Sequence, residues 1–336
     1  MKGFTGDEQV KALRTIALEE HYITPAIMKA TGSTDPLLKI IAATNSKLIE
    51  QLLDLGEGRI ADMDASGTDV QVLSVTSPGV EQLDASEAVE LARDSNDYLA
   101  NAVRRYPDRF IGLATLPTIV PDTAADELER MVSEHGFKGA IINGHTRGRY
   151  LDDEYFWPIL ERAAKLQIPI YIHPAEPPKP VIEASYLGNY PPATAAILAR
   201  GGWGWHIETG LHVLRVILSG AFDRFPELQI IIGHLGEGLP FMKGRLDFTL
   251  PPKITKLDRT VGSYLCENVY YNFANFLFIP TFLDLFLQVG AERIMYSVDY
   301  PYSSGMEARS FLEQLPVSPD DKKRIAHGNA ERLFRL

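Results

Sequence analysis

The sequence predicts an α/β protein folded as one (β/α)8 TIM barrel, and three observations lead to this expectation. Eight short apolar segments alternate along the chain with segments of helical periodicity. Most apolar segments are continuous runs rich in valine and isoleucine, which is typical of parallel strands covered on both faces. The length of 336 residues is usual for a single barrel. A doubly wound open sheet is the competing fold, but no glycine-rich phosphate loop follows the first apolar segment.

The expected strands are short apolar runs that end in a turn or in polar residues. They cover residues 16–21, 69–75, 110–116, 138–143, 168–173, 228–234, 268–273 and 293–299. Each run has the length of an ordinary strand, and a helical segment separates it from the next one. All eight strands are therefore expected to be parallel, with their carboxyl ends at one mouth of the barrel.

The expected helices show apolar residues three and four positions apart. They cover residues 46–65, 85–106, 121–136, 153–166, 206–222 and 280–289, with a further helix around Arg245 and a helical C-terminal region. Gly67 and Gly136 supply helix ends, and Pro121 supplies a helix start. Two longer loops, residues 22–45 with short helical pieces and the proline-rich residues 174–192, are expected as insertions over the mouth.

The composition excludes several classes of protein. A net charge of −11 argues against a nucleic-acid partner or an acidic membrane surface. The single cysteine, Cys266, excludes an internal disulfide framework and a cysteine-based zinc cluster. The N-terminal residues lack the apolar core of a signal peptide, and no apolar run is long enough to cross a bilayer. We therefore expect one cytoplasmic domain over residues 1–336.

The first expected strand ends in two acids and an imidazole, Glu19, Glu20 and His21. Residues two apart in a strand point to the same face, so Glu19 and His21 should project together and Glu20 away from them. A carboxylate beside an imidazole is half of a metal site. Alone, the pattern also fits a polar strand end without chemistry, so the other half must come from other strands.

Three more expected strands end in residues that bind metals. His173 ends the fifth strand, His234 the sixth and Asp299 the eighth. Catalytic groups of barrels come from the carboxyl ends of several strands, so these residues should meet at the mouth. We predict a divalent-metal site, and a carboxylate–imidazole set without a thiolate suits Zn²⁺, Mn²⁺ or Fe²⁺.

Other polar and aromatic residues are weaker candidates. Four histidines lie in or beside expected helices and are expected to be structural: His135, His206, His212 and His327. His145 and Arg147, in the loop after the fourth strand, are expected either to reach substrate or to face solvent. Asn143, at the end of that strand, is expected to bind substrate. Six aromatic residues near the mouth are candidates for holding a flat substrate: Tyr22, Trp203, Trp205, Phe276, Tyr300 and Tyr302.

Four motifs at these strand ends resemble the metal-dependent amidohydrolase superfamily. They are Leu18-Glu-Glu-His21, Tyr171-Ile-His-Pro174, Ile232-Gly-His-Leu-Gly-Glu-Gly-Leu-Pro240 and Tyr296-Ser-Val-Asp-Tyr-Pro301. The chain is more narrowly similar to the branch of non-oxidative aromatic acid decarboxylases, which includes γ-resorcylate, 2,3-dihydroxybenzoate and 5-carboxyvanillate decarboxylases. The similarity extends to Pro107-Asp-Arg-Phe110, Phe222-Asp-Arg-Phe-Pro226 and Asn329-Ala-Glu-Arg-Leu-Phe334.

The resemblance implies roles for individual residues. Glu19, His21, His173 and Asp299 would bind one divalent metal, zinc or manganese. His234 would lie near Asp299, Glu237 near His234, and Arg245 would contact substrate. Hydrolytic members usually carry His-x-His on the first strand, so the Glu-x-His of this chain favours decarboxylation. Members of this branch tend to form homodimers or homotetramers.

The expected reaction is loss of CO₂ from an ortho-hydroxylated benzoate. The metal would act as template and Lewis acid, and Asp299, protonated through contact with His234, would deliver a proton to the ring carbon. A metal-dependent hydrolase of an amide, ester or lactone, with Asp299 as base for a metal-bound water, is the alternative. A non-catalytic barrel that binds a ligand is a third possibility and predicts no bound metal.

Overall fold

The computed structural model describes residues 13–32 and 45–336, where the eight expected strands form one parallel sheet in chain order. The strands are β1 (Ile16–Tyr22), β2 (Val70–Val75), β3 (Phe110–Thr115), β4 (Gly139–Asn143), β5 (Ile170–His173), β6 (Ile230–Ile232), β7 (Val269–Asn272) and β8 (Ile294–Met295). A parallel bridge between Leu18 and Ser297 joins the first strand to the segment after the last. The sheet therefore closes, and the predicted (β/α)8 barrel is confirmed.

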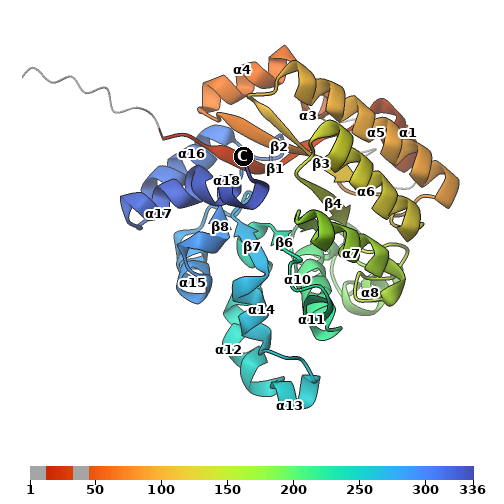
Figure 1. The fold of residues 1–336 in the computed structure, drawn as a ribbon, viewed down its shortest axis with the longest axis vertical. Helices are drawn as coiled ribbons and strands as arrows, with labels where there is room; N and C mark the ends of the chain where they lie inside the picture. The colour runs from red at the N-terminus through yellow and green to blue at the C-terminus, as the bar shows by residue number, and fades with distance from the viewer. Residues whose placement is uncertain (1–12, 33–44) are drawn as a thin grey trace, which may run out of the picture.

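Helices surround the barrel, and α12 to α14 project away from its body (Figure 1). The α-helices are α1 (Pro25–Gly32), α3 (Ser46–Leu53), α4 (Glu57–Ser66), α5 (Ala85–Arg105), α6 (Pro121–His135), α7 (Trp157–Leu166), α8 (Lys179–Ser185), α9 (Pro192–Ala199), α10 (Gly204–Leu218), α11 (Ala221–Arg224), α12 (Leu239–Thr249), α13 (Pro252–Thr255), α14 (Val261–Glu267), α15 (Ile279–Val289), α16 (Gly305–Gln314), α17 (Pro319–Lys323) and α18 (Asn329–Phe334). Within the described ranges, none of them combines the length and apolarity of a bilayer-spanning segment.

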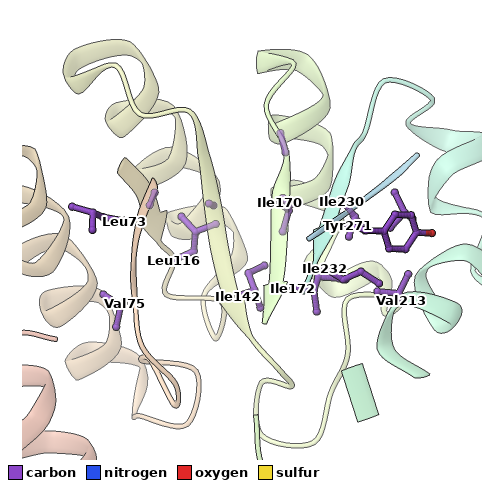
Figure 2. Packing of buried hydrophobic residues seen from close by; sticks show 14 of the residues in the cluster. Leu73, Val75, Leu116, Ile142, Ile170, Ile172, Val213, Ile230, Ile232 and Tyr271 are labelled. Atoms are coloured by element: carbon purple, nitrogen blue, oxygen red, sulfur yellow. The ribbon is translucent and has the colours of Figure 1, made fainter. Parts of the chain in front are cut away.

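Alternation along the strands divides their side chains between two apolar layers. The outer layer packs the strands against the helices, and Figure 2 shows Val75, Ile142, Ile172 and Ile232 in it. The smaller inner layer fills the barrel with residues of all eight strands: Ile16, Leu18, Val70, Val72, Leu113, Ile141, Tyr171, Ile231, Tyr270 and Met295. The site residues lie above this apolar floor.

Three predicted elements are wrong in detail. The helix expected over residues 46–65 is two helices, because the Asp54 carboxylate accepts hydrogen bonds from the Gly56 and Arg59 amides (2.6 and 2.9 Å) and turns the chain. The loop expected over residues 174–192 contains α8. The helix expected over residues 206–222 divides into α10 and α11 at Gly220, which has a left-handed φ of 79°.

The long loop expected over residues 22–45 is described only in part. Its first half contains α1, which fits the expectation of short helical pieces. Residues 33–44 lie outside the described residues, as do residues 1–12, where the absence of a signal peptide was expected.

Candidate active site

The end of β1 turns Glu19 and His21 inward, but it does so through an irregularity. Ala17 packs in the outer layer and Leu18 in the inner one, as regular alternation requires. The pairing of β1 with β2 shifts between Ala17 and Glu20, and Glu19 has a left-handed φ of 63°. Leu18 and Glu19 consequently both face the barrel interior. The alternation resumes one residue out of step, so that Glu20 faces outward and His21 inward.

Glu20 and Arg59 hold this strand end from the outside. The Glu20 carboxylate accepts hydrogen bonds from Gln71 Nε2 (3.1 Å) and from the Val298 amide (2.9 Å). Arg59 is fully buried and donates to the His21 carbonyl oxygen (2.6 Å). Burial raises the pKa of Glu20 well above its ordinary value. These contacts fix the backbone of β1 and of the segment after β8.

We call Glu19, His21, His173 and Asp299 the Glu19 cluster. Ligand atoms of its first three residues all lie within 4.8 Å of one another. His173 Nε2 is 3.3 Å from Glu19 Oε1, and His21 Nε2 is 3.4 Å from Asp299 Oδ1. All four residues are buried. The structure therefore brings together the residues expected as ligands.

The donor atoms of the Glu19 cluster fit a divalent metal ion. Glu19 Oε1, both ring nitrogens of His21 and Nδ1 of His173 are buried without a hydrogen-bond partner. Metal–ligand bonds of about 2.0–2.2 Å place neighbouring ligand atoms roughly 2.9–3.6 Å apart, which matches the separations in the cluster. Unsatisfied buried polar atoms are costly, so a cation here would stabilise the cluster.

The ionisation of the cluster also suits metal binding. Burial alone would raise the pKa of Glu19, but the neighbouring imidazoles of His234 and His173 outweigh it and lower this pKa to about 2. Burial lowers the pKa of His21. Near neutral pH, Glu19 is therefore an anion and the His21 ring is neutral, the forms in which both residues bind metals.

His206, His234 and Glu237 form a second group, which we call the Glu237 cluster. The two oxygens of the Glu237 carboxylate accept hydrogen bonds from His234 Nδ1 and His206 Nδ1, both at 2.7 Å. His234 Nε2 points to the Glu19 cluster, 3.5 Å from Glu19 Oε1. Burial lowers the pKa of His234, but Glu19 and Glu237 outweigh it and raise this pKa to about 10.

The expectation of a purely structural role for His206 overlooked its contact with Glu237. The other three histidines expected to be structural lie elsewhere: His135 is beside Arg130, His212 accepts from the Leu151 amide, and His327 pairs with Glu331. The sequence gives no signal for the contact between His206 and Glu237, because the two residues are distant from each other in the chain.

The last two site-bearing strands are shorter than predicted. β6 ends at Ile232 and β8 at Met295, so His234 and Asp299 lie in the turns that follow. Glu19, His234, Glu237 and Asp299 have positive φ angles of 63°, 50°, 54° and 71°. Side-chain-bearing residues rarely adopt this conformation, which costs on the order of 1–3 kcal/mol each and is concentrated at functional sites.

Sequence reasoning missed three residues that support Glu19. The Tyr171 hydroxyl donates to Glu19 Oε2, and Asn272 Nδ2 donates to the Tyr171 oxygen (2.8 Å). A Cβ at Gly233 would crowd Glu19 Oε2 and the Tyr171 hydroxyl, so glycine leaves room for both groups. Tyr171 lies two positions before His173 on the same face, and this signal could have identified it.

A cavity of about 560 Å³ lies beside the two clusters. His173, His234 and Asp299 form part of its wall. Its other lining residues include Thr76, Pro78, Gln82, Leu83, His145, Pro174, Glu176, Arg200, Trp205 and Tyr302. Of the two residues expected in the loop after β4, His145 lines the cavity, whereas Arg147 pairs with Asp84 (2.6 Å).

Asn143 lies at the end of β4, in register with His173 of β5, but it is not among the residues that line the cavity. It follows Ile141 of the inner layer by two residues, so it faces the barrel interior. Both polar atoms of its amide are buried without a hydrogen-bond partner. Its backbone amide donates to Glu81 Oε1 (2.7 Å), and burial raises the pKa of Glu81 to about 7.

Like Asn143, the other three residues expected to bind substrate do not line the cavity. The Tyr22 hydroxyl bonds to Ser95 on α5, in the layer between strands and helices. The Tyr300 hydroxyl donates to Asp62 Oδ2 on α4 (2.6 Å). Tyr22 directly follows the inward-facing His21 on β1, so it points outward. Arg245 is exposed on α12.

The fold and these clusters define a (β/α)8 barrel with a carboxylate–imidazole metal-binding site at its carboxyl end. The sequence pattern of the amidohydrolase family matches residues 49–336, and the chain belongs to this family. The resemblance found in the motifs is thus confirmed.

Curated and solved relatives narrow the class. The chain is 36% identical over 334 residues to the γ-resorcylate decarboxylase of Polaromonas sp., covering 96% of this chain and 98% of the relative. It superposes on 5-carboxyvanillate decarboxylase of Novosphingobium aromaticivorans, complexed with manganese and 4-hydroxy-3-methoxy-5-nitrobenzoic acid, with a TM-score of 0.89, 38% identity and 99% and 98% coverage.

A third relative is the dihydroxybenzoic acid decarboxylase of Polaromonas sp., solved with manganese and the inhibitor 2-nitroresorcinol. It has a TM-score of 0.86 and 34% identity, with 96% of this chain and 97% of that chain covered. These relatives are decarboxylases, and the chain is accordingly assigned to the carboxy-lyases.

Proposed function

We propose that the protein is a metal-dependent, non-oxidative decarboxylase of a hydroxylated aromatic carboxylic acid similar to γ-resorcylate. One observation carries the proposal: Glu19, His21 and His173 bring carboxylate and imidazole ligand atoms within 4.8 Å of one another beside the cavity that Asp299 lines. The γ-resorcylate and 5-carboxyvanillate decarboxylases among its relatives favour this reaction over hydrolysis of an amide, ester or lactone.

Glu19, His21, His173 and Asp299 would hold one divalent ion. Two carboxylates and two imidazoles suit manganese and zinc alike, and the manganese of two solved relatives favours manganese. When bound, the ion supplies Lewis acidity and a template for a substrate phenolate and carboxylate.

Asp299 carries the proton that the reaction consumes. It donates this proton to the ring carbon that bears the carboxylate, and an electron pair of the ring forms the new C–H bond. The bond between that carbon and the carboxylate then breaks, its electron pair restores the aromatic ring, and CO₂ leaves. His234, held at Nδ1 by Glu237, presents Nε2 to the site and returns a proton to Asp299.

The cavity wall would position a flat substrate and exclude water. Trp205 and Tyr302 offer aromatic faces, and Pro78 and Pro174 add rigid apolar surface. Tyr22 and Tyr300 have no part in this arrangement.

The proposal also includes a cytoplasmic homo-oligomer, a dimer or a tetramer. Free Cys266 is compatible with a reducing compartment. Phe241, Met242 and Phe248 expose apolar side chains on α12, 79%, 42% and 78% accessible, which a second subunit would cover. Sedimentation equilibrium would measure the mass, and a monomer at all concentrations would contradict this part.

The decisive experiment is a panel of hydroxybenzoates offered to protein freed of metal and reloaded with Mn²⁺ or Zn²⁺, with products followed by mass spectrometry. The expected result is loss of CO₂ from an ortho-hydroxylated acid by the loaded protein and no turnover by the metal-free protein. Turnover of amides, esters or lactones alone would instead assign a hydrolase.

A further inference from the structure

A continuous set of hydrogen bonds connects the cavity wall to the proposed proton-transfer residues. Trp205, which lines the cavity, donates from Nε1 to His206 Nε2 (3.2 Å). His206 Nδ1 bonds to one oxygen of Glu237, whose other oxygen bonds to His234 Nδ1, both at 2.7 Å. His234 Nε2 faces the Glu19 cluster. His206 is thus the only step in this path from Trp205 to Glu237.

The polarity of these bonds follows from the chemistry of the groups. Indole nitrogen is a donor only, so His206 Nε2 must accept and its proton must be on Nδ1. An ionised carboxylate only accepts, so both imidazoles donate to Glu237 from Nδ1. Separations of 2.7 Å are those of charge-assisted hydrogen bonds. A metal ion bound between these three residues would have to displace the Nδ1 protons of His206 and His234, which the two hydrogen bonds to Glu237 require.

Close packing around Glu237 restricts the movement of its side chain, and the two hydrogen bonds set the orientation of its carboxylate. Its side chain is fully buried, and that of His206 is 12% exposed. A Cβ at Gly210 would lie 2.7 Å from the Glu237 carbonyl oxygen, so α10 approaches this turn as closely as glycine allows. The Phe276 ring contacts both imidazoles, with centroids 5.0 and 5.3 Å away.

We infer that His206 is a positioning residue of the active site. It holds the Glu237 carboxylate in the plane that fixes the ring orientation of His234, so that Nε2 remains directed at the reacting centre. It lies outside the cavity wall, and it reaches His234 through Glu237 and through an edge contact between the two rings, whose centroids are 4.7 Å apart. The inference rests on the proposed decarboxylase, in which His234 returns the proton to Asp299.

Three variants separate the two bonds of His206. His206→Asn places an amide N–H near the position of Nδ1 and keeps the bond to Glu237. His206→Gln extends to the position of Nε2 and keeps the bond with Trp205, while His206→Phe keeps only the ring. We expect kcat to fall roughly 10- to 100-fold in the Gln and Phe variants and to remain near the wild-type value in the Asn variant, with KM and metal content little changed.

A second readout does not depend on turnover. Imidazole N–H protons held by a buried carboxylate exchange slowly and resonate far downfield, so ¹⁵N-histidine labelling should show two such protons in the wild-type protein. His206→Asn should remove one and leave the His234 signal in place. His206→Phe should shift or broaden the His234 signal as well. The inference is wrong if the wild-type spectrum lacks these two protons. It is also wrong if His206→Phe leaves the His234 signal unchanged.

His212→Gln is the matched control, because His212 lies buried on the same helix and bonds to the Leu151 amide instead. It should lower the thermal midpoint without lowering kcat. A kcat loss equal to that of His206→Gln, or an Asn variant as slow as the Phe variant, would assign the effect to α10 as a whole and overturn the inference. If the wild-type protein decarboxylates nothing, the proposed function fails while the NMR result still judges the His206–Glu237–His234 geometry.

Discussion

The Glu19 and Glu237 clusters each combine a glutamate with two histidines whose ligand atoms lie within 4.8 Å of one another, yet the two clusters suit different tasks. In the Glu19 cluster, carboxylate and ring atoms lie 3.3–3.4 Å apart, and several have no hydrogen-bond partner. In the Glu237 cluster, the carboxylate accepts two hydrogen bonds of 2.7 Å. A cation can complete the first group, whereas the second is complete without one.

This difference shows what proximity alone does not. Both groups meet a distance criterion for holding a metal ion. The two clusters differ in their hydrogen bonding: a buried polar atom requires a partner, and each hydrogen bond needs one proton. The following predictions test this separation, from the largest expected effect to the smallest.

Glu19→Gln should have the largest effect. The amide keeps the size of the side chain but loses the charge that binds the cation, so we expect metal affinity to fall by more than the roughly 10- to 100-fold typical of a residue behind the ligands, and turnover to vanish. Elemental analysis and titration with Mn²⁺ would measure this. A variant that retains full metal occupancy would show that the cluster is not the metal site.

Asp299→Asn should abolish the chemistry and disturb binding less. The amide retains one oxygen for the cation but cannot deliver an acidic proton, so we expect kcat to fall roughly 10²- to 10⁴-fold. Stopped-flow assays together with circular dichroism would check rate and fold. Substantial release of CO₂ by the variant would remove Asp299 from the role of proton donor.

Glu237→Gln tests the second cluster in the same way. One amide oxygen cannot accept from both imidazoles as the carboxylate does, so His234 loses its fixed orientation. We expect a decrease of roughly 10- to 100-fold in kcat/KM, with metal content close to that of the wild-type protein. A loss of metal as complete as in Glu19→Gln would mean that the two clusters act as one site.

Glu81 extends the comparison to a carboxylate with no imidazole partner. Burial raises its pKa from 4.5 to about 7, so between these values the folded chain keeps a proton that the unfolded chain has released. The free energy of unfolding should therefore fall as the pH rises through this window, by on the order of 3 kcal/mol for this group.

Glu81→Gln should remove this contribution. Urea unfolding at about pH 5 and about pH 8 should show a smaller decrease in stability for the variant than for the wild-type protein. Replacement of the exposed Glu134 by glutamine is the control and should leave the pH dependence unchanged. An identical pH dependence in Glu81→Gln and wild type would contradict the raised pKa.

The barrel and the Glu19 cluster could be predicted because both follow from repetition. Apolar runs alternate with helices, and polar residues at their ends must meet at one mouth. Alternation also contained information that the predictions did not use: Tyr22 follows the inward-facing His21 on the same strand and therefore had to point outward. Its assignment to substrate ignored this.

The positions of Glu237 and His206 depend on features with no local signature. His234, Glu237 and Asp299 lie in turns with positive φ, where the period of a strand no longer applies. His206 lies in the first turn of α10, whose contact with Glu237 is fixed by tertiary packing around Gly210. No spacing in the sequence encodes such a contact, since the helix and the turn meet only in the folded chain.

The left-handed residue in β1 has a consequence for how such a site can change or be transplanted. A substitution in β1 changes the atoms that face the interior but not the positions that face it. Loss or gain of one residue between Leu18 and His21 would turn the inward-facing residues that follow outward, and the outward-facing ones inward. Point mutation can therefore explore new chemistry here, and length changes cannot. A designer who grafts this ligand set onto another barrel must copy the backbone of Ile16–Tyr22 together with its side chains.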